Sequence, residues 1–414
     1  MRWCFKTGRG VGVKTFVLCW ELGAGLGHVG RLVPIAKALE ARGHRCVLLL
    51  RDLVQSGGLL REQGLLALQA PVWLHQVAGL PDPRVSLSEI LLGQGYLQAA
   101  TLSGLVDGWT SALETIVADA VIGDYAPTAV LAARVLGLPS ITVGLGFYMP
   151  PDVHPMPSFL TDAAVPPQRL QQADARVLAT VNAVLGAAAR APLARVSTLF
   201  CGDAPMLCTW PELDHYGRGA LPPGQRWLGP SFMTRGGETP VWNDGDGPRA
   251  FAYLKAGHPA SADALRALVA VGCRTLCYMP EVAAGRAPPV SSPLIRHAKA
   301  PVDVAAAMKD ARLMVTHAGE ATVVQGLTSG VPVLMLPLHR EQALMATRVA
   351  RSGAAIDANG MKGPGPLTTA VQRLLHEPAF IAQARAFAER HATFDQQAQI
   401  EAIAEAALGL LRSR

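Results

Sequence analysis

The chain repeats one pattern, in which short apolar runs of strand length are separated by segments whose apolar residues return every three or four positions. After the first run, Leu32, Ile35 and Leu39 fall on one face of a predicted helix. The runs predicted to form strands are 15–20, 44–50, 120–124, 140–143, 196–202, 206–209, 250–255, 274–279, 313–315 and 331–336. Buried strands that alternate with helices are typical of parallel sheets covered on both faces, so an α/β fold with doubly wound sheets is expected.

Turn-forming residues gather most densely between residues 221 and 248, where Gly, Pro and Asp recur. Such a cluster is typical of a linker, and a chain of 414 residues is long enough for two domains of ordinary size. We therefore expect an N-terminal domain over residues 1–222 and a second domain over residues 223–378. From residue 378 the pattern predicts one long helix that runs toward the end of the chain.

The composition allows a large apolar core, because 50% of the residues are hydrophobic and 16% are charged. Charges, Gly or Pro interrupt every apolar run before it reaches membrane-spanning length, so no spanning helix is predicted. Residues 1–13 are basic and Gly-rich and are interpreted as a disordered extension, while Lys14 interrupts any signal-peptide pattern. The net charge of +6 fits ordinary surface charge and leaves open an attraction to anionic nucleotide sugars or to a lipid surface.

Seven cysteines are scattered along the chain, and none forms a CxxC pair. The pairs Cys201/Cys208 and Cys273/Cys277 lack the spacing and the histidine partners of zinc sites. Free, buried thiols are therefore expected, which suits the reducing cytoplasm. The sequence predicts no metal site.

A Gly-rich turn follows the first predicted strand, and two interpretations of it compete. Gly25, Gly27 and Gly30 fit the G-x-G-x-x-G fingerprint of dinucleotide-binding folds. Asp52 ends the second strand about twenty residues later, which is the spacing of the acidic residue in that fingerprint. Taken alone, this pattern predicts an NAD(P)-dependent oxidoreductase. In the other interpretation the glycines serve a different ligand that the backbone must approach just as closely.

The most informative stretch is 313–356, where a strand, a tight turn, a short helix and a second strand follow one another. Small residues make the turn at 317–319, a helix is predicted over 322–328, and Gly330 ends it. A turn at the carboxyl end of a parallel strand that opens a helix presents backbone N–H groups, which bind anions and phosphate above all. A phosphate-binding site is therefore expected here.

Several residues at fixed spacings in this stretch resemble the donor-sugar signature of GT-B nucleotide-sugar glycosyltransferases, most of all the UDP-glycosyltransferase-like family (glycosyltransferase family 1). They are His317, Gly319, Thr322, Gly330-Val331-Pro332 and Glu341-Gln342. Gly27-His28, followed by Pro34 and by Gly43-His44, resembles the opening of the same family. The resemblance implies two Rossmann-like domains facing across a cleft, with an acceptor-binding domain first and a donor-binding domain second. It also implies that a C-terminal helix, 379–414, returns toward the first domain.

The resemblance supplies a candidate base and its partner. A sugar or phenol hydroxyl is a poor nucleophile, and in the family a neutral histidine, matched here by His28, removes its proton. Asp124 ends a predicted strand at the same edge of the sheet and resembles the aspartate that fixes the tautomer of this histidine and stabilises the imidazolium. The sequence leaves a second interpretation open, in which Asp124 caps the helix that follows it.

In the second domain the resemblance implies a set of donor-binding residues. Together with Gly27 they are His317, Ala318, Gly319, Ala321, Thr322, Gln325, Glu341 and Gln342. His317 and the backbone N–H groups of the 318–322 turn would hold the diphosphate, and the helix dipole would stabilise it as it leaves without a metal. Gln325 stands where the family commonly has a Glu that binds the ribose, so a charge-assisted hydrogen bond is lost. The 254–259 turn also departs from the family pattern.

These observations predict an inverting, metal-independent glycosyltransferase that moves a hexose from a UDP- or dTDP-sugar to an acceptor hydroxyl. The nucleotide sugar is a co-substrate, and no cofactor is expected. The acceptor is expected to be a small molecule or lipid-linked, with no nucleic-acid partner, and peripheral association with a membrane stays open. Two alternatives remain, namely the NAD(P)-dependent oxidoreductase and a non-catalytic nucleotide-sugar-binding partner protein.

Overall fold

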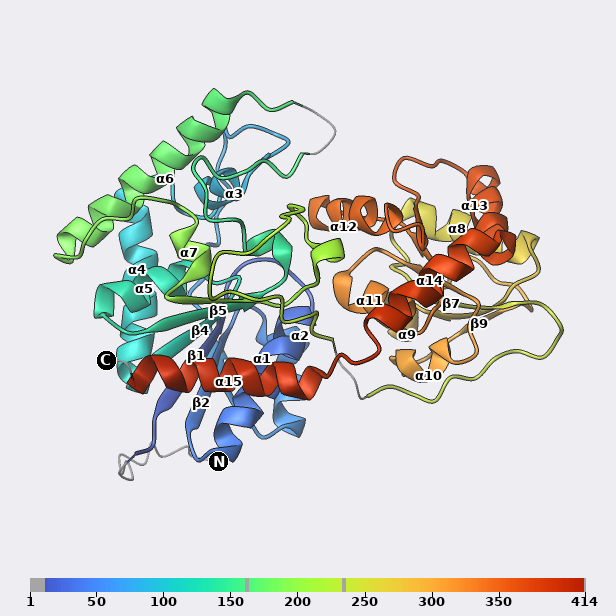
Figure 1. The fold of residues 1–414 in the computed structure, drawn as a ribbon, viewed down its shortest axis with the longest axis horizontal. Helices are drawn as coiled ribbons and strands as arrows, with labels where there is room; N and C mark the ends of the chain where they lie inside the picture. The colour runs from blue at the N-terminus through green and yellow to red at the C-terminus, as the bar shows by residue number, and fades with distance from the viewer. Residues whose placement is uncertain (1–11, 161–163, 233–235, 413–414) are drawn as a thin grey trace. The chain divides into compact units, whose positions relative to one another are not determined.

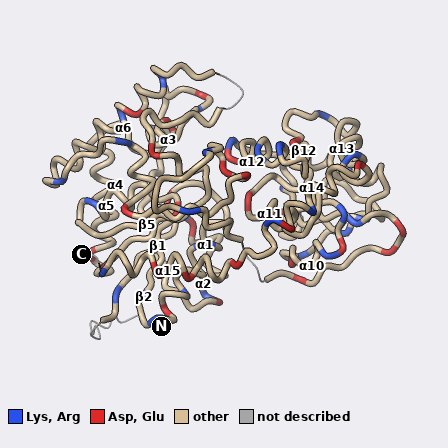
Figure 2. Tube along the Cα trace, in the orientation of Figure 1, with Lys and Arg blue, Asp and Glu red and all other residues tan. Residues whose placement is uncertain are grey.

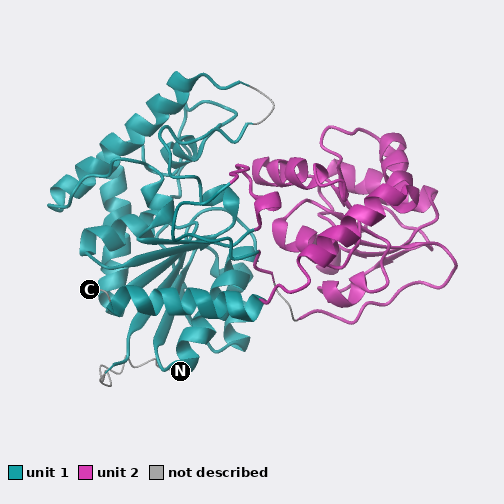
Figure 3. Cartoon of the chain, in the orientation of Figure 1, with its two compact units in different colours: residues 1–209, 220–229, 396–414 teal, residues 210–219, 230–395 magenta. Residues whose placement is uncertain are grey.

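The computed structural model describes residues 12–160, 164–232 and 236–412. The disordered extension expected over 1–13 lies outside the described residues, apart from its last two positions. The chain divides into two compact units (Figure 3). The first unit comprises 1–209, 220–229 and 396–414, and the second comprises 210–219 and 230–395. Acidic and basic residues are distributed along both units (Figure 2).

The first unit is built around one parallel sheet (Figure 1). Its strands are β1 (Thr15–Trp20), β2 (Arg45–Leu50), β3 (Leu66–Gln69), β4 (Ala120–Asp124), β5 (Ser140–Gly144) and β6 (Ala204–Leu207), in the order β3-β2-β1-β4-β5-β6. Its helices are α1 (Gly27–Ala41), α2 (Leu53–Glu62), α3 (Leu87–Leu92), α4 (Ala99–Ile116), α5 (Pro127–Leu136), the 3₁₀ turn η1 (Gly146–Tyr148), α6 (Pro167–Ala187), α7 (Thr198–Cys201) and α15 (Gln396–Arg412). The central strands β1 and β4 are buried along their whole length, which explains their unbroken apolar sequences.

The second unit contains another parallel sheet of the same kind. Its strands are β7 (Arg249–Tyr253), β8 (Arg274–Tyr278), β9 (Ile295–His297), β10 (Leu313–Thr316), β11 (Val333–Met335) and β12 (Ala355–Asp357), in the order β12-β11-β10-β7-β8-β9. Its helices are the 3₁₀ turn η2 (Pro211–Leu213), α8 (Pro259–Ala270), α9 (Pro280–Ala283), α10 (Val304–Met308), α11 (Glu320–Thr328), α12 (Arg340–Ala350), α13 (Pro364–His376) and α14 (Pro378–Arg390). The predicted α/β class with two doubly wound parallel sheets is confirmed.

Two predicted elements are wrong. The run 196–202 is not a strand, because part of it forms the short helix α7. The single helix predicted from residue 378 is two helices, α14 and α15, separated by the non-helical residues 391–395. At the end of α14 the ring of His391 stacks on Trp210, with centroids 3.6 Å apart, and its Nε2 lies 2.7 Å from Oε1 of Glu212. These contacts join residues 210–219 to the second unit, ahead of the boundary expected at residue 222.

The last helix belongs to the first unit. One face of α15 is buried in the same apolar cluster as strands β1, β2 and β4, through Ile400, Ile403, Ala404, Ala407 and Leu408. The amide of Gln399 donates to the carbonyls of Leu228 and Gly229, and Glu401 pairs with Arg42 at the end of α1. Apolar burial and these polar contacts therefore hold the end of the chain against α1.

A buried carboxylate holds the loop after β1 against the start of α5. Glu21 is 2% exposed, and its side chain accepts hydrogen bonds from the backbone N–H of Thr128 (2.8 Å) and from the hydroxyl of Thr128. The first of these bonds satisfies a backbone N–H group that a helix start leaves without an intrahelical acceptor. Burial nevertheless dominates and raises the pKa of Glu21 from 4.5 to about 7.

Replacing Ile403 by Ala should destabilise the first unit by about 2–5 kcal/mol, because the side chain is 1% exposed and its loss leaves a cavity under α15. Urea unfolding followed by tryptophan fluorescence measures this loss. The matched control is Gln397→Ala on the exposed face of the same helix, which should unfold like the wild type. Equal unfolding midpoints for the two variants would show that α15 does not contribute to the core.

Glu21→Gln should change how stability depends on pH. The folded pKa of Glu21 lies above its unfolded value, so its stabilising contribution is complete below about pH 4.5 and is lost as the pH rises through about 7. Gln does not titrate, so the variant should gain about 3 kcal/mol relative to wild type between these limits. Urea unfolding at about pH 5 and about pH 8 measures the difference. Glu62→Gln, at an exposed site, is the control, and a wild type that tracks Glu21→Gln at both pH values would refute the prediction.

Candidate functional site

His28 and Asp124 meet at the carboxyl edge of the first sheet because β1 and β4 are neighbours. Trp20, the last residue of β1, pairs in register with Asp124, the last residue of β4. The loop after β1 leads into α1, whose second residue is His28. The Nδ1 atom of His28 lies 2.9 Å from Oδ1 of Asp124, and both residues are buried. The sequence-based expectation that these two side chains meet is confirmed.

The helix-cap interpretation of Asp124 does not describe this structure. Helix α5 begins at Pro127, and the side chain of its N-cap residue, Ala126, makes no capping bond. The backbone N–H of Thr128 in its first turn is instead bonded by Glu21, from the loop after β1. Asp124 therefore keeps both carboxylate oxygens for side chains of the site.

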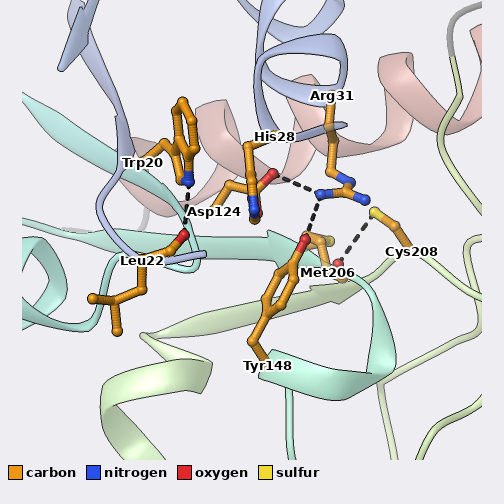
Figure 4. A network of polar contacts seen from close by, with 8 residues as sticks. All are labelled: Trp20, Leu22, His28, Arg31, Asp124, Tyr148, Met206 and Cys208. Atoms are coloured by element: carbon orange, nitrogen blue, oxygen red, sulfur yellow. Dashed lines mark hydrogen bonds and ion pairs between the residues drawn. The ribbon is translucent and has the colours of Figure 1, made fainter. Parts of the chain in front are cut away.

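Arg31 is a third member of this cluster, one helical turn beyond His28 on α1. Its Nη1 donates to Oδ2 of Asp124 (2.6 Å) and to the hydroxyl of Tyr148 (2.7 Å) (Figure 4). Burial alone would raise the pKa of Asp124, but the charges and hydrogen bonds of Arg31 and His28 hold it below its usual value. The carboxylate is therefore ionised. The sequence analysis missed Arg31, although a basic residue three positions after His28, next to apolar Leu32, was a usable signal.

Aromatic rings enclose the imidazole of His28. Trp20 stacks on it with ring centroids 5.0 Å apart, and Tyr148 lies on a tilted plane at 5.4 Å. Tyr148 in turn stacks on Tyr125 at 4.6 Å. The indole N–H of Trp20 donates to the carbonyl of Leu22, which holds that ring in place. These contacts restrict the ring of His28 to one orientation, and the sequence analysis did not foresee them.

Gly23 leaves space beside Nε2, the second ring nitrogen of His28. A Cβ at this position would lie 2.9 Å from Nε2 of His28, and the backbone has φ +80°, which side chains rarely tolerate. Since Nδ1 faces an ionised carboxylate, the proton of the neutral ring sits on Nδ1, and Nε2 presents its lone pair. An imidazole held in this way can accept a proton through Nε2.

The residues of the dinucleotide fingerprint have structural roles in this protein. Oδ1 of Asp52 accepts hydrogen bonds from the backbone N–H groups of Val54 and Gln55, each at 3.0 Å, and so caps α2. Gly25 adopts φ +93° in the turn, and Gly27 is the first residue of α1. Asp52 is thus used as a helix cap, which removes the specific support for an oxidoreductase.

In the second unit, the predicted phosphate-binding turn lies between β10 and α11. Ala318 adopts a left-handed conformation with φ 64°, and Gly319 is the N-cap residue of α11. The next residues of the set, Ala321 and Thr322, lie in the first turn of α11 and are half-buried. Their position places the positive end of the helix and its first N–H groups at the carboxyl edge of the second sheet.

A direct contact between His317 and phosphate would require a ring nitrogen that faces this turn. Neither nitrogen of His317 does so. Its Nδ1 donates to the carbonyl of Leu336 (2.7 Å), and its Nε2 accepts from the backbone N–H of Lys255 (2.8 Å). Burial lowers the pKa of His317 to about 4, so the ring is neutral at physiological pH. The loops after β7 and β11 both bond to this ring because their strands flank β10 on either side. In this structure His317 braces the turn.

The remaining donor-binding residues lie on the helices that follow β10 and β11. Gln325 is one turn into α11, and its amide donates to the carbonyl of Ala321 (3.0 Å). Glu341 and Gln342 are in the first turn of α12, where Oε1 of Gln342 accepts from the N–H of Leu338 (2.9 Å). Because β10 and β11 are adjacent and parallel, both helices start at the same edge of the sheet. The structure thus brings these residues to one edge of the second sheet.

Among the described residues, no group of three or more His, Cys, Asp or Glu side chains is arranged to hold a metal ion. None of the helices that the structure describes is both long enough and apolar enough to cross a membrane. None of the six described cysteines forms a disulfide, and five of them are buried.

Comparison with known proteins agrees with this geometry. Residues 307–393 match the sequence model of the family described as UDP-glucoronosyl and UDP-glucosyl transferase. The zeaxanthin glucosyltransferase of Pantoea ananas is 27% identical over 379 residues, covering 79% of this chain and 80% of that protein.

Solved structures show the same fold. The glycosyltransferase of kitacinnamycin has a TM-score of 0.70 at 19% identity, covering 95% of this chain and 98% of its own. The glycosyltransferase VinC, solved in complex with dTDP, has a TM-score of 0.63 at 18% identity, covering 95% of this chain and 100% of its own. The donor-site motif, the two parallel sheets and these likenesses together indicate a glycosyltransferase of the GT-B fold that resembles the UDP-glycosyltransferase-like proteins of glycosyltransferase family 1.

Proposed function

We propose that this protein transfers a hexose from a UDP- or dTDP-sugar to an acceptor hydroxyl with inversion at the anomeric carbon, and that His28 is the general base. The contact between Nδ1 of His28 and ionised Asp124 carries the proposal, because it leaves Nε2 as the proton acceptor. A carboxylate on the far side of an imidazole fixes the tautomer and stabilises the imidazolium that forms. Gly23 keeps the approach to Nε2 open.

The proposed reaction is a single displacement. The acceptor O–H gives its proton to Nε2 of His28 as the oxygen bonds to the anomeric carbon. The bond from that carbon to the diphosphate oxygen breaks on the opposite face, so the configuration inverts. The leaving diphosphate gains negative charge, which the N–H groups and dipole at the start of α11 would stabilise. This proposal needs neither a metal nor a cofactor besides the nucleotide sugar.

For the donor, the second unit supports a nucleotide diphosphate sugar. The diphosphate would bind the backbone of the turn that His317 braces, and Glu341 and Gln342 would contact the sugar hydroxyls. Gln325 would offer the ribose a neutral amide, which forms a weaker hydrogen bond than a carboxylate does. VinC was solved with dTDP, and the matched family is named for UDP-sugars, so both nucleotides are candidates.

For the acceptor, the surroundings of His28 favour a molecule with an apolar or aromatic body. Trp20, Tyr125 and Tyr148 line the ring of the base, and a curated relative is named for the carotenoid zeaxanthin. A small molecule and a lipid-linked acceptor both meet this description, and the latter would require contact with a membrane surface. The free thiols support a reducing compartment such as the cytoplasm.

Two alanine variants should separate donor binding from chemistry. UDP or dTDP at about a hundred times its dissociation constant should stabilise the wild type by about 2.7 kcal/mol in thermal unfolding. His28→Ala should keep this stabilisation and lose roughly 10²- to 10⁴-fold in turnover, because it lacks only the base. His317→Ala should lose the stabilisation, because the turn loses its brace. His376→Ala, at an exposed site on α13, is the matched control and should behave as wild type.

Other outcomes would point elsewhere. Stabilisation by NAD(P)H and by no nucleotide diphosphate would favour the oxidoreductase. Donor binding without turnover across a panel of phenols, sugars and lipid alcohols would favour a non-catalytic binding partner. Full turnover by His28→Ala would contradict the assignment of the base.

A further inference from the structure

Arg31 and His28 each contact one oxygen of the Asp124 carboxylate. Oδ1 of Asp124 lies 2.9 Å from Nδ1 of His28, and Oδ2 lies 2.6 Å from Nη1 of Arg31. The guanidinium is 6% exposed and the carboxylate fully buried, so solvent screens neither charge strongly. A buried cation this close to the dyad must influence the equilibrium in which His28 takes up a proton.

The groups that face His28 define the charge balance. They come from β4 (Asp124), from α1 (Arg31), from the turn after β4 (Tyr125) and from η1 (Tyr148), with Cys208 beyond Arg31 (Figure 4). Phenols and thiols ordinarily stay protonated at neutral pH. The cluster is then neutral overall while His28 is neutral, and it becomes a net cation once His28 is protonated. Without Arg31, the same step would convert a net anion into a neutral pair, which is easier in a buried site.

Arg31 also fixes positions. The same Nη1 that bonds Asp124 donates to the hydroxyl of Tyr148 (2.7 Å), and the ring of Tyr148 lies against both His28 and Tyr125. One guanidinium therefore ties the carboxylate behind the base to an aromatic ring beside it. Because Arg31 follows His28 by three positions on α1, the helix holds both side chains on one face.

We propose that Arg31 is a positioning residue that restrains proton uptake by His28 and so keeps the base neutral, and active, at lower pH. Its positive charge offsets the negative charge of Asp124, and its hydrogen bonds hold that carboxylate and Tyr148 in place. The proposal rests on the proposed function, because it concerns the acid side of the pH profile of sugar transfer.

Two substitutions at Arg31 separate charge from hydrogen bonding. Arg31→Gln keeps an N–H donor but removes the charge, and Arg31→Lys keeps the charge on a differently shaped donor. The control is Lys37→Gln, which removes a positive charge from an exposed position on the same helix. For each protein, kcat/KM is measured across pH with a saturating donor, and thermal unfolding checks that the variant is folded.

The charge should control the pH profile. A unit charge about 6 Å away in a partly screened site corresponds to a shift on the order of 2 pH units. In Arg31→Gln the acid limb of kcat/KM should therefore move up by about one pH unit or more. In Arg31→Lys the limb should stay in place while kcat falls, and Lys37→Gln should match wild type. A folded Arg31→Gln whose acid limb coincides with that of wild type would overturn the proposal.

Arg31→Lys provides a second test if Arg31→Gln does not fold. Because Lys keeps the positive charge, a folded Arg31→Lys whose acid limb moves up from that of wild type would also overturn the proposal. Wild-type protein without any sugar transfer would instead reject the proposed function, so the two failures are distinguishable.

Discussion

The adjacency of β1 and β4 is the constraint on which the first unit depends. Parallel pairing in register sets Trp20 beside Asp124, so the chain that leaves β1 must pass over the carboxylate at the end of β4. The Gly-rich loop makes that passage with φ +80° at Gly23 and delivers His28 in the first turn of α1. The buried carboxylate of Asp124 requires a charged partner, and Arg31, on the same helix as His28, provides it.

The two histidines of the sequence motifs are held in opposite ways. His28 bonds a side chain through one nitrogen and faces the space left by a glycine with the other, which suits proton transfer. Both ring nitrogens of His317 form hydrogen bonds with backbone groups from the loops on either side of β10, which suits a structural brace. The difference arises from what surrounds each ring, an anion in one case and a carbonyl and an N–H in the other. Burial lowers the pKa of His317 to about 4, so its ring stays neutral, which suits a rigid brace.

Sequence reasoning reached the features that depend on local pattern. The unbroken apolar runs of β1 and β4 and the turn before α11 were predicted from residue type and spacing, and Asp124 was expected beside His28 because both follow strand ends. Features that depend on strand order were missed. The brace at His317 needs partners at residues 255 and 336, and the aromatic enclosure of His28 needs η1 beside β4. The break before α15 was also not predicted, and the contact found there, between His391 and Trp210, joins residues distant in sequence.

The most direct test of this account is the tautomer of His28, measured from the ring ¹⁵N chemical shifts of histidine-labelled protein near neutral pH. Comparison with His28→Gln assigns the signal. The hydrogen bond to Asp124 predicts that the neutral form of the ring carries its proton on Nδ1 and leaves Nε2 bare. A neutral ring protonated on Nε2 would contradict the account, because the nitrogen that faces Gly23 could then accept no proton from an acceptor.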